Sequence, residues 1–205
     1  MRASTSHFPR RQRGVTLIVV LILLTVVTII GIGGARIALL GERSTRFDRD
    51  YQLAWQAAEA ALMDAEYDIR GPNTHGSQRL ATFTQELNRI AFVPSCGDTT
   101  ANRGLCDPVV GATPIWQTVD FLDMTVNRRV VQFGEFTGRA FDTGTIGVRP
   151  EIRPRYIVEQ LVDPTPGKSA GGAGGKEAIY RITAMGFGPS TDVQVMLQTS
   201  FKKDF

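Results

Sequence analysis

Two cysteines, Cys96 and Cys106, are the residues of this chain best suited to covalent chemistry. Nine residues separate them, among glycines, an asparagine and other residues that are typical of turns. Outside the cytoplasm, two cysteines at this spacing are expected to form a disulfide that closes a surface loop. A structural zinc site needs further ligands, and no histidine lies nearby in the sequence. We therefore predict a disulfide and no metal site.

Two glycine-lysine pairs look like fragments of a phosphate-binding loop, Gly167-Lys168-Ser169 and Gly174-Gly175-Lys176. That motif requires another glycine five residues before the glycine-lysine pair. The chain has Val162 and Ala170 at those positions. The stretch 167–176 is therefore expected to be a flexible hairpin loop rather than a nucleotide site.

Histidine and carboxylate chemistry find little support. His75, beside Gly76 on a predicted loop, is the one histidine outside the basic N-terminus, and a single histidine does not supply a nucleophile–base pair. Asp120, Asp123 and Glu135 are scattered and are expected on a solvated surface rather than around a metal. We predict no enzyme activity, no catalytic residues and no cofactor.

The N-terminus has the composition of a membrane segment. Residues 1–14 carry four arginines and no acid, and residues 15–35 carry no charge. As a helix, those 21 residues span about 31 Å, which matches the hydrocarbon core of a bilayer. The positive-inside rule places residues 1–14 in the cytoplasm and the chain beyond about residue 40 outside.

The helical pattern continues past the membrane segment without a break. Apolar residues recur every three or four positions at Tyr51, Trp55, Ala58, Leu62, Ala65 and Ile69. Glu42 and Arg46 form a favourable pair one turn apart, and Gly71-Pro72 is a strong stop signal. We predict one helix from Val15 to Arg70, about 84 Å long, whose face with Trp55 and Leu62 packs on a sheet.

The rest of the chain predicts one more helix and an antiparallel sheet. Leu80, Phe83, Leu87 and Ile90 suggest a short helix. Segments rich in β-branched and aromatic residues predict strands at 129–133, 155–161, 179–185 and 193–201, the last two forming a hairpin around Pro189-Ser190. The fold class is α+β, with a long N-terminal helix, half transmembrane, packed on an antiparallel β-sheet domain.

A family resemblance begins at the start of the apolar run. The junction Arg11-Gln12-Arg13-Gly14-Val15-Thr16-Leu17-Ile18 resembles the class III signal sequence of type IV pilins. The resemblance implies that a prepilin peptidase cuts after Gly14 and that Val15 becomes the new N-terminus, methylated on its amine. The usual first residue of a mature pilin is phenylalanine, so Val15 departs from the pattern.

A second departure lies at the fifth mature residue, where most pilins carry glutamate and this chain has Val19. In the family, that glutamate lies in hydrocarbon and pairs with the N-terminal amine of a neighbouring subunit. A carboxylate there is costly without such a partner. Its absence suggests that this chain is not an ordinary repeating subunit of the filament.

The segment from Trp55 to Glu66, with the start of the helix, resembles the PilX-type minor pilins, which are pilus assembly proteins. The resemblance covers about residues 10–70. It implies a cleaved leader at 1–14, a transmembrane and filament-core helix at 15–40, its amphipathic continuation at 41–70, and a periplasmic α+β domain at 72–205. The expected location is the inner membrane, with the N-terminus cytoplasmic and the C-terminal domain periplasmic, and possible membership of the pilus filament.

The resemblance implies a minor pilin that primes pilus assembly at or near the filament tip. Its partners would be other minor pilins, the major pilin, the prepilin peptidase and the inner-membrane assembly platform. Two alternatives stay open: a minor pseudopilin of a type II secretion system, and a signal-anchored periplasmic adhesin or binding protein. A plain signal anchor and a cleaved secretory signal compete for the N-terminal segment itself.

The charge of the chain agrees with a discarded leader. The full sequence has 23 Lys and Arg against 20 Asp and Glu, and a pI of about 9.1, which suggests nucleic-acid binding. Removing residues 1–14 takes away four arginines and no acid, which leaves 19 against 20. The expected mature protein is close to neutral, so we predict no nucleic-acid partner.

Overall fold

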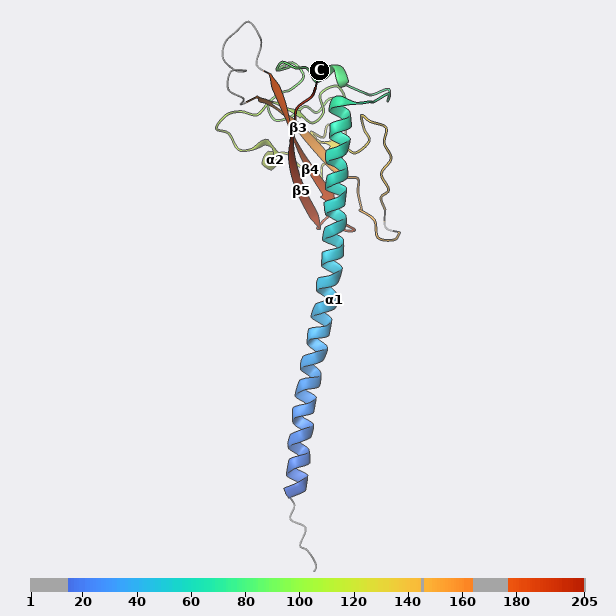
Figure 1. The fold of residues 1–205 in the computed structure, drawn as a ribbon, viewed down its shortest axis with the longest axis vertical. Coiled ribbons are helices and arrows are strands. Elements are labelled where there is room, and N and C mark those ends of the chain that lie inside the picture. Colours follow the sequence, from blue (N-terminus) through green and yellow to red (C-terminus); the bar gives the residue numbers. More distant parts are fainter. Residues whose placement is uncertain (1–14, 145, 164–176, 205) are drawn as a thin grey trace, which may run out of the picture. The chain divides into compact units, whose positions relative to one another are not determined.

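The computed structural model describes residues 15–144, 146–163 and 177–204 (Figure 1). The expected leader with Gly14 and the expected hairpin loop at 167–176 lie outside the described residues. The chain divides into two compact units, Met1–Phe47 and Asp48–Phe205. One helix contributes to both units, and the sheet belongs to the second.

Helix α1 covers Val15–Arg70, with the bounds that the sequence predicts. Within its apolar part, the hydroxyls of Thr25 and Thr28 donate to the carbonyls of Ile22 and Leu24, at 2.7 and 2.9 Å. These bonds satisfy the hydroxyls of Thr25 and Thr28 within the helix. The helix ends at Arg70, and the following Gly71 has a positive φ of 74°, the left-handed cap that favours glycine.

The sheet contains β1 (Leu105–Cys106), β2 (Val131–Gln132), β3 (Arg155–Val162), β4 (Ala178–Phe187) and β5 (Gln194–Phe201). Strands β3, β4 and β5 form an antiparallel meander, with eight registered residue pairs at each of its two junctions. Strand β2 pairs antiparallel with the start of β3, and β1 pairs parallel with its middle. The α+β fold class is confirmed, with one parallel pair that the sequence pattern does not indicate.

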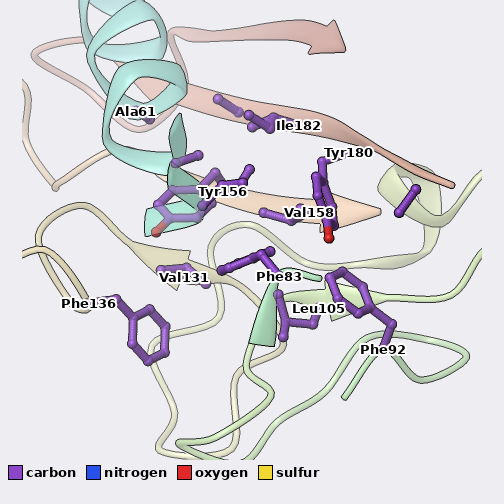
Figure 2. Packing of buried hydrophobic residues seen from close by; sticks show 14 residues of the cluster. Ala61, Phe83, Phe92, Leu105, Val131, Phe136, Tyr156, Val158, Tyr180 and Ile182 are labelled. Atoms are coloured by element: carbon purple, nitrogen blue, oxygen red, sulfur yellow. The ribbon is translucent and has the colours of Figure 1, made fainter. Parts of the chain in front are cut away.

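The two faces of the sheet bury separate clusters of apolar side chains. The cluster on the α1 side contains Ala61, Ala65 and Ile69 of the helix, with Tyr156, Val158, Tyr180 and Ile182 of the sheet. Figure 2 shows aromatic rings from the loops gathered in this cluster. Phe83 and Phe92 lie 5.4 and 5.9 Å from Tyr180, ring centre to ring centre. The opposite face buries Ile157, Met185 and Phe187 under a loop that contains the short helix α2 (Ile115–Thr118).

The predicted helix around residues 80–90 is wrong. Only a three-residue 3-10 turn forms there, at Leu80–Thr82. The next residues bond to the sheet instead of continuing a helix: the Ala178 N–H donates to the Gln85 carbonyl at 2.8 Å, and Glu86 forms a bridge with Glu177. This segment extends the sheet and sends Phe83 into the core, while Ile90 stays 93% exposed.

Candidate functional site

The first functional element is the apolar part of α1. Every side chain from Val15 to Phe47 is exposed. By length and composition, this part of the helix is able to cross a membrane, and none of its most apolar window is buried within the described chain. The helix runs unbroken through Gly31, Gly33 and Gly34, where added β-carbons would meet only open space.

Val15 and Val19 lie one turn apart at the start of this segment. Their side chains are 60% and 48% exposed. The first turn of the helix contains no acid, and position 19 presents an isopropyl group. Apart from the hydroxyl of Thr16, this part of the helix offers apolar side chains and no charge.

The second functional element is the docking face of α1, the buried small residues that meet the sheet: Ala54, Ala58, Ala61, Ala65 and the larger Ile69. The helix and sheet approach so closely that a β-carbon on Gly186 of β4 would overlap the Ala54 carbonyl oxygen and the Ala58 nitrogen. The alanines therefore do more than favour helix formation. They allow the backbones of α1 and β4 to contact each other.

The predicted orientation of this face is partly wrong. Ala58, Ala65 and Ile69 are buried as expected, but Trp55 remains 41% exposed and Leu62 is only half-buried. The Trp55 indole N–H donates to the Glu59 carboxylate at 2.8 Å, along the outside of the helix. Helix α1 and Gly186 of β4 lie too close together to leave room for an indole between them. The helix therefore turns its alanines, and not Trp55, toward the sheet.

A buried ion pair anchors the end of the docking face. Asp68 is fully buried and receives two hydrogen bonds at Oδ2 from the Arg79 guanidinium, at 2.6 and 3.0 Å. The Tyr156 hydroxyl donates to the same oxygen at 3.1 Å. Burial, with the nearby Asp68 carboxylate, raises the pKa of Tyr156 well above its ordinary value. The phenol therefore stays protonated and remains a donor throughout the physiological range.

The Arg79 guanidinium joins this ion pair to the loops. Its third nitrogen donates to the Arg103 carbonyl at 2.7 Å, and its central carbon lies 3.7 Å from the centre of the Phe136 ring. All three of its nitrogens are thus used. The helix, the sheet and two loops meet at one buried charge.

Asp64, one turn earlier, holds a second loop. Its carboxylate accepts from the Gly134 N–H at 2.8 Å and from the Thr137 hydroxyl at 2.5 Å, with Arg139 at 3.7 Å. Burial raises the pKa of Asp64, against the opposing effect of these donors. Sequence reasoning missed both aspartates. Two carboxylates four residues apart among buried alanines are the signal that could have found them, because acids on such a face need partners.

The disulfide between Cys96 and Cys106 is present, as the sequence predicts. Both cysteines are buried, at 5% and 0% exposure, in the cluster beneath α2. Only the tip of the loop, residues 98–101, is exposed. The disulfide is thus a core contact that presents a short polar tip, rather than a link on the surface.

The remaining predicted surface residues divide into two groups. Asp120 and Asp123 are exposed or half-exposed and accept from backbone N–H groups two residues ahead, and His75 is exposed. Glu135 contradicts the prediction, because it is partly buried and pairs with Arg103 and Arg128. Burial raises the pKa of Glu135, but hydrogen bonds from Gln132, Arg103 and Arg128 outweigh it and hold the pKa below its ordinary value.

These contacts hold the second half of α1 against the sheet and its loops. Within the described ranges, no group of three His, Cys, Asp or Glu side chains is arranged to hold a metal ion. The buried acids and the alanines fix residues 54–69 against the sheet, and the apolar side chains of residues 15–40 face outward. An exposed apolar helix of this kind is suited to packing side by side with other apolar helices.

Comparison with known families agrees with this geometry. Residues 93–203, more than half of the chain, match the family model described as type IV pilus assembly protein PilX, C-terminal part. Residues 13–62 match the model of the PilX N-terminal region. No curated protein and no solved structure matches the chain.

Proposed function

This chain belongs to the PilX family of type IV pilus assembly proteins, and from that premise we propose that it primes pilus assembly at or near the filament tip. The family makes the chain a minor pilin, a structural component of the pilus. The priming role and the tip position are inferences of our own. They rest chiefly on one observation, the apolar residue at position 19.

Before assembly, residues 15–40 anchor the protein in the inner membrane. The four arginines of residues 1–14 support an orientation with the N-terminus in the cytoplasm and residues 72–205 in the periplasm. The prepilin peptidase then cuts between Gly14 and Val15, and the new amine of Val15 is methylated. The assembly platform of the inner membrane and the other pilins, major and minor, are the remaining partners.

During assembly, the apolar part of α1 leaves the bilayer for the filament core. Its side chains exchange lipid contacts for contacts with the helices of neighbouring subunits, so extraction need not expose them to water. The exposed valines, leucines and isoleucines of residues 15–40 supply that surface. Thr25 and Thr28 do not oppose the transfer, because their hydroxyls are bonded to the helix backbone.

The absence of an acid at position 19 supports a position at the end of the filament. In a repeating subunit, the amine of one chain pairs with the acid of its neighbour, so each subunit needs both groups. Val19 removes the acid while Val15 still provides an amine after cleavage. Such a subunit contacts a neighbour through its own amine but cannot accept one in the same way.

The substitution Val19→Glu tests this position, with Val19→Leu as the matched apolar control. If the chain starts filaments, restoring the acid allows it to enter the repeating lattice, and both the number and the length of pili change. Piliated cells are counted by electron microscopy, with the control expected to match the wild type. Unchanged pili in the glutamate variant contradict the tip position.

Mass spectrometry of the purified protein tests the cleavage. The expected N-terminal peptide begins at a methylated Val15. An intact Met1, or a start after Ala35, contradicts processing by a prepilin peptidase and returns the N-terminal segment to a plain anchor or a secretory signal.

A further inference from the structure

A shallow groove lies on the surface of α1 immediately after its uncharged run. It has a volume of about 240 Å³ and is lined by Arg36, Leu39, Leu40 and Arg43. Counted from Arg36, the other three follow at three, four and seven positions, so all four lie on one face of the helix. Leu39 and Leu40 are 60% and 65% exposed, and both arginines are exposed as well. The groove thus has an apolar floor with a cation at each end.

The two arginines of the groove have no acid partner. Arg46, one turn further along α1, shows the usual alternative, because it pairs with the Glu42 carboxylate at 2.5 Å. Within the described ranges of the chain, the side chains of Arg36 and Arg43 form neither a hydrogen bond nor an ion pair. Both guanidiniums are therefore available to an anion from outside the chain.

The groove lies at the depth of lipid headgroups when residues 15–35 cross a membrane. Those residues carry no charge and, as a helix, match the thickness of the hydrocarbon core. The headgroups add a layer of roughly 5–7 Å on each side of that core. Arg36 begins this layer, and Arg43 follows about 10 Å further along the helix axis. Since long arginine side chains reach along the helix to a polar layer, both guanidiniums reach the phosphates of one leaflet.

We propose that the groove binds one anionic phospholipid of this leaflet, with the lipid phosphate held by Arg36 and Arg43. Guanidinium groups bind phosphate oxygens through paired, charge-assisted hydrogen bonds. Leucine side chains of a helix lean toward its N-terminus, which is the direction of the hydrocarbon core here. Leu39 and Leu40 would therefore contact the glycerol and the first methylene groups of the lipid. The membrane location rests on the function proposed above, whereas the groove and its charges belong to the helix itself.

The charges and the leucines together select the occupant. A free phosphate would satisfy the arginines but leave the leucines exposed to water. A zwitterionic lipid carries its own cation, which competes with the guanidiniums for the phosphate. Each arginine near a membrane surface contributes about 1 kcal/mol to the binding of anionic lipid, which is about fivefold in affinity. An anionic phospholipid is the ligand that uses both parts of the groove.

Native mass spectrometry of the full-length protein in a neutral detergent tests the proposal. The protein is titrated with phosphatidylglycerol or with phosphatidylcholine that has the same acyl chains. We expect the wild type to prefer phosphatidylglycerol, and the double variant Arg36→Gln, Arg43→Gln to bind it about 30-fold more weakly, with unchanged binding of phosphatidylcholine. Equal binding of the two lipids by the wild type overturns the proposal.

A matched control separates the groove from the overall charge of the helix. The double variant Arg46→Gln, Arg49→Gln removes the same number of charges, but from arginines that pair with Glu42 and Asp50. We expect this variant to keep the preference for phosphatidylglycerol. An equal loss of affinity in both double variants overturns the proposal. Circular dichroism checks that each variant retains the helical signal of the wild type.

Inorganic phosphate distinguishes a lipid site from a site for any phosphate. An excess of inorganic phosphate is expected not to displace bound phosphatidylglycerol, because it makes no contact with the leucines. The variant Leu39→Ser, Leu40→Ser is expected to bind both lipids more weakly, with its arginines intact. Displacement by inorganic phosphate, or full lipid binding by the serine variant, overturns the proposal.

Two further observations separate this inference from the proposed function. If the protein stays with cell membranes during alkaline extraction but the Arg36 and Arg43 variant keeps its lipid preference, the lipid site fails and the membrane anchoring stands. If the lipid binds as expected but deletion of the gene leaves pili unchanged, the priming role fails and the lipid site stands.

Discussion

Gly186 lies where β4 comes closest to α1. Its missing side chain allows the strand to contact the backbone of the helix at Ala54 and Ala58. Glycine within a strand usually weakens it, so a glycine here indicates close approach of another backbone. At this point there is room for the hydrogen atom of a glycine but not for a methyl group.

Gly186→Ala is therefore expected to destabilise the domain by about 1–3 kcal/mol, the usual cost of overpacking a core. The new methyl group would overlap backbone atoms, which move less easily than side chains. Urea unfolding of the purified protein measures the loss. The control is Gly76→Ala, where an added β-carbon meets only open space, and a loss of equal size there would contradict the argument.

Asp68 and Arg79 depend on each other, because both are buried and neither has water to replace its partner. Asp68→Ala leaves the guanidinium uncompensated and is expected to cost about 3–5 kcal/mol in the free energy of unfolding. The double variant Asp68→Leu, Arg79→Met removes both charges and should recover most of that loss. Equal instability of the single and double variants would show that the pair contributes through its shape rather than its charge.

Few of these residue contacts could be predicted from the sequence. The alanines between Ala54 and Ala65 have high helix propensity, which explains them without a docking face. Glu135 looks like any surface acid, because its partners Arg103 and Arg128 come from distant loops. Tertiary contacts give these residues their roles, and a single sequence does not contain the distances.

At the scale of elements, periodicity predicted the long parts well. Helix α1 and strands β3, β4 and β5 repeat their patterns over eight residues or more, so local signals add up. The two-residue strand β1 is too short for any pattern, and the strand predicted at 129–133 forms only at Val131–Gln132, as β2. The segment after Leu80 has helical spacing, yet its backbone bonds to the sheet, which no local pattern reveals.

The disulfide is the covalent link between elements, since it connects the end of β1 to the loop before it. Replacing both cysteines by serine is expected to cost about 2–3 kcal/mol, the entropy released by a closed loop of roughly ten residues. The same urea experiment with and without a reductant measures the effect on the wild type. A wild type insensitive to reductant would mean that the buried cluster beneath α2 holds the loop unaided.

At the scale of the molecule, the stability of the domain resides in the second unit, Asp48–Phe205. The buried helix residues begin at Ala54, and none precedes it in the described part of α1. The first unit contributes exposed apolar side chains, and by length and composition its helix is able to cross a membrane.

Two truncations test this division. A fragment that begins at Asp48 retains the docking face with Asp64 and Asp68, so it should fold and unfold cooperatively in water without detergent. A fragment that begins at Pro72 loses the helix and leaves Arg79 buried without its acid, and it should not fold. Circular dichroism during heating measures both. A cooperative transition in the shorter fragment would contradict the role assigned to the helix.

The direction of the docked helix has a mechanical consequence. From Ala54 to Arg70, α1 runs alongside β5 and in the same sense, with contacts to the sheet distributed from Gly186 to Phe201. Tension on the helix at Asp48, directed along its axis, therefore loads these contacts in shear. In shear, the alanine contacts and both buried aspartates resist together, whereas a peeling force would break them one after another. The domain is therefore built to keep its helix attached under tension along the helix axis.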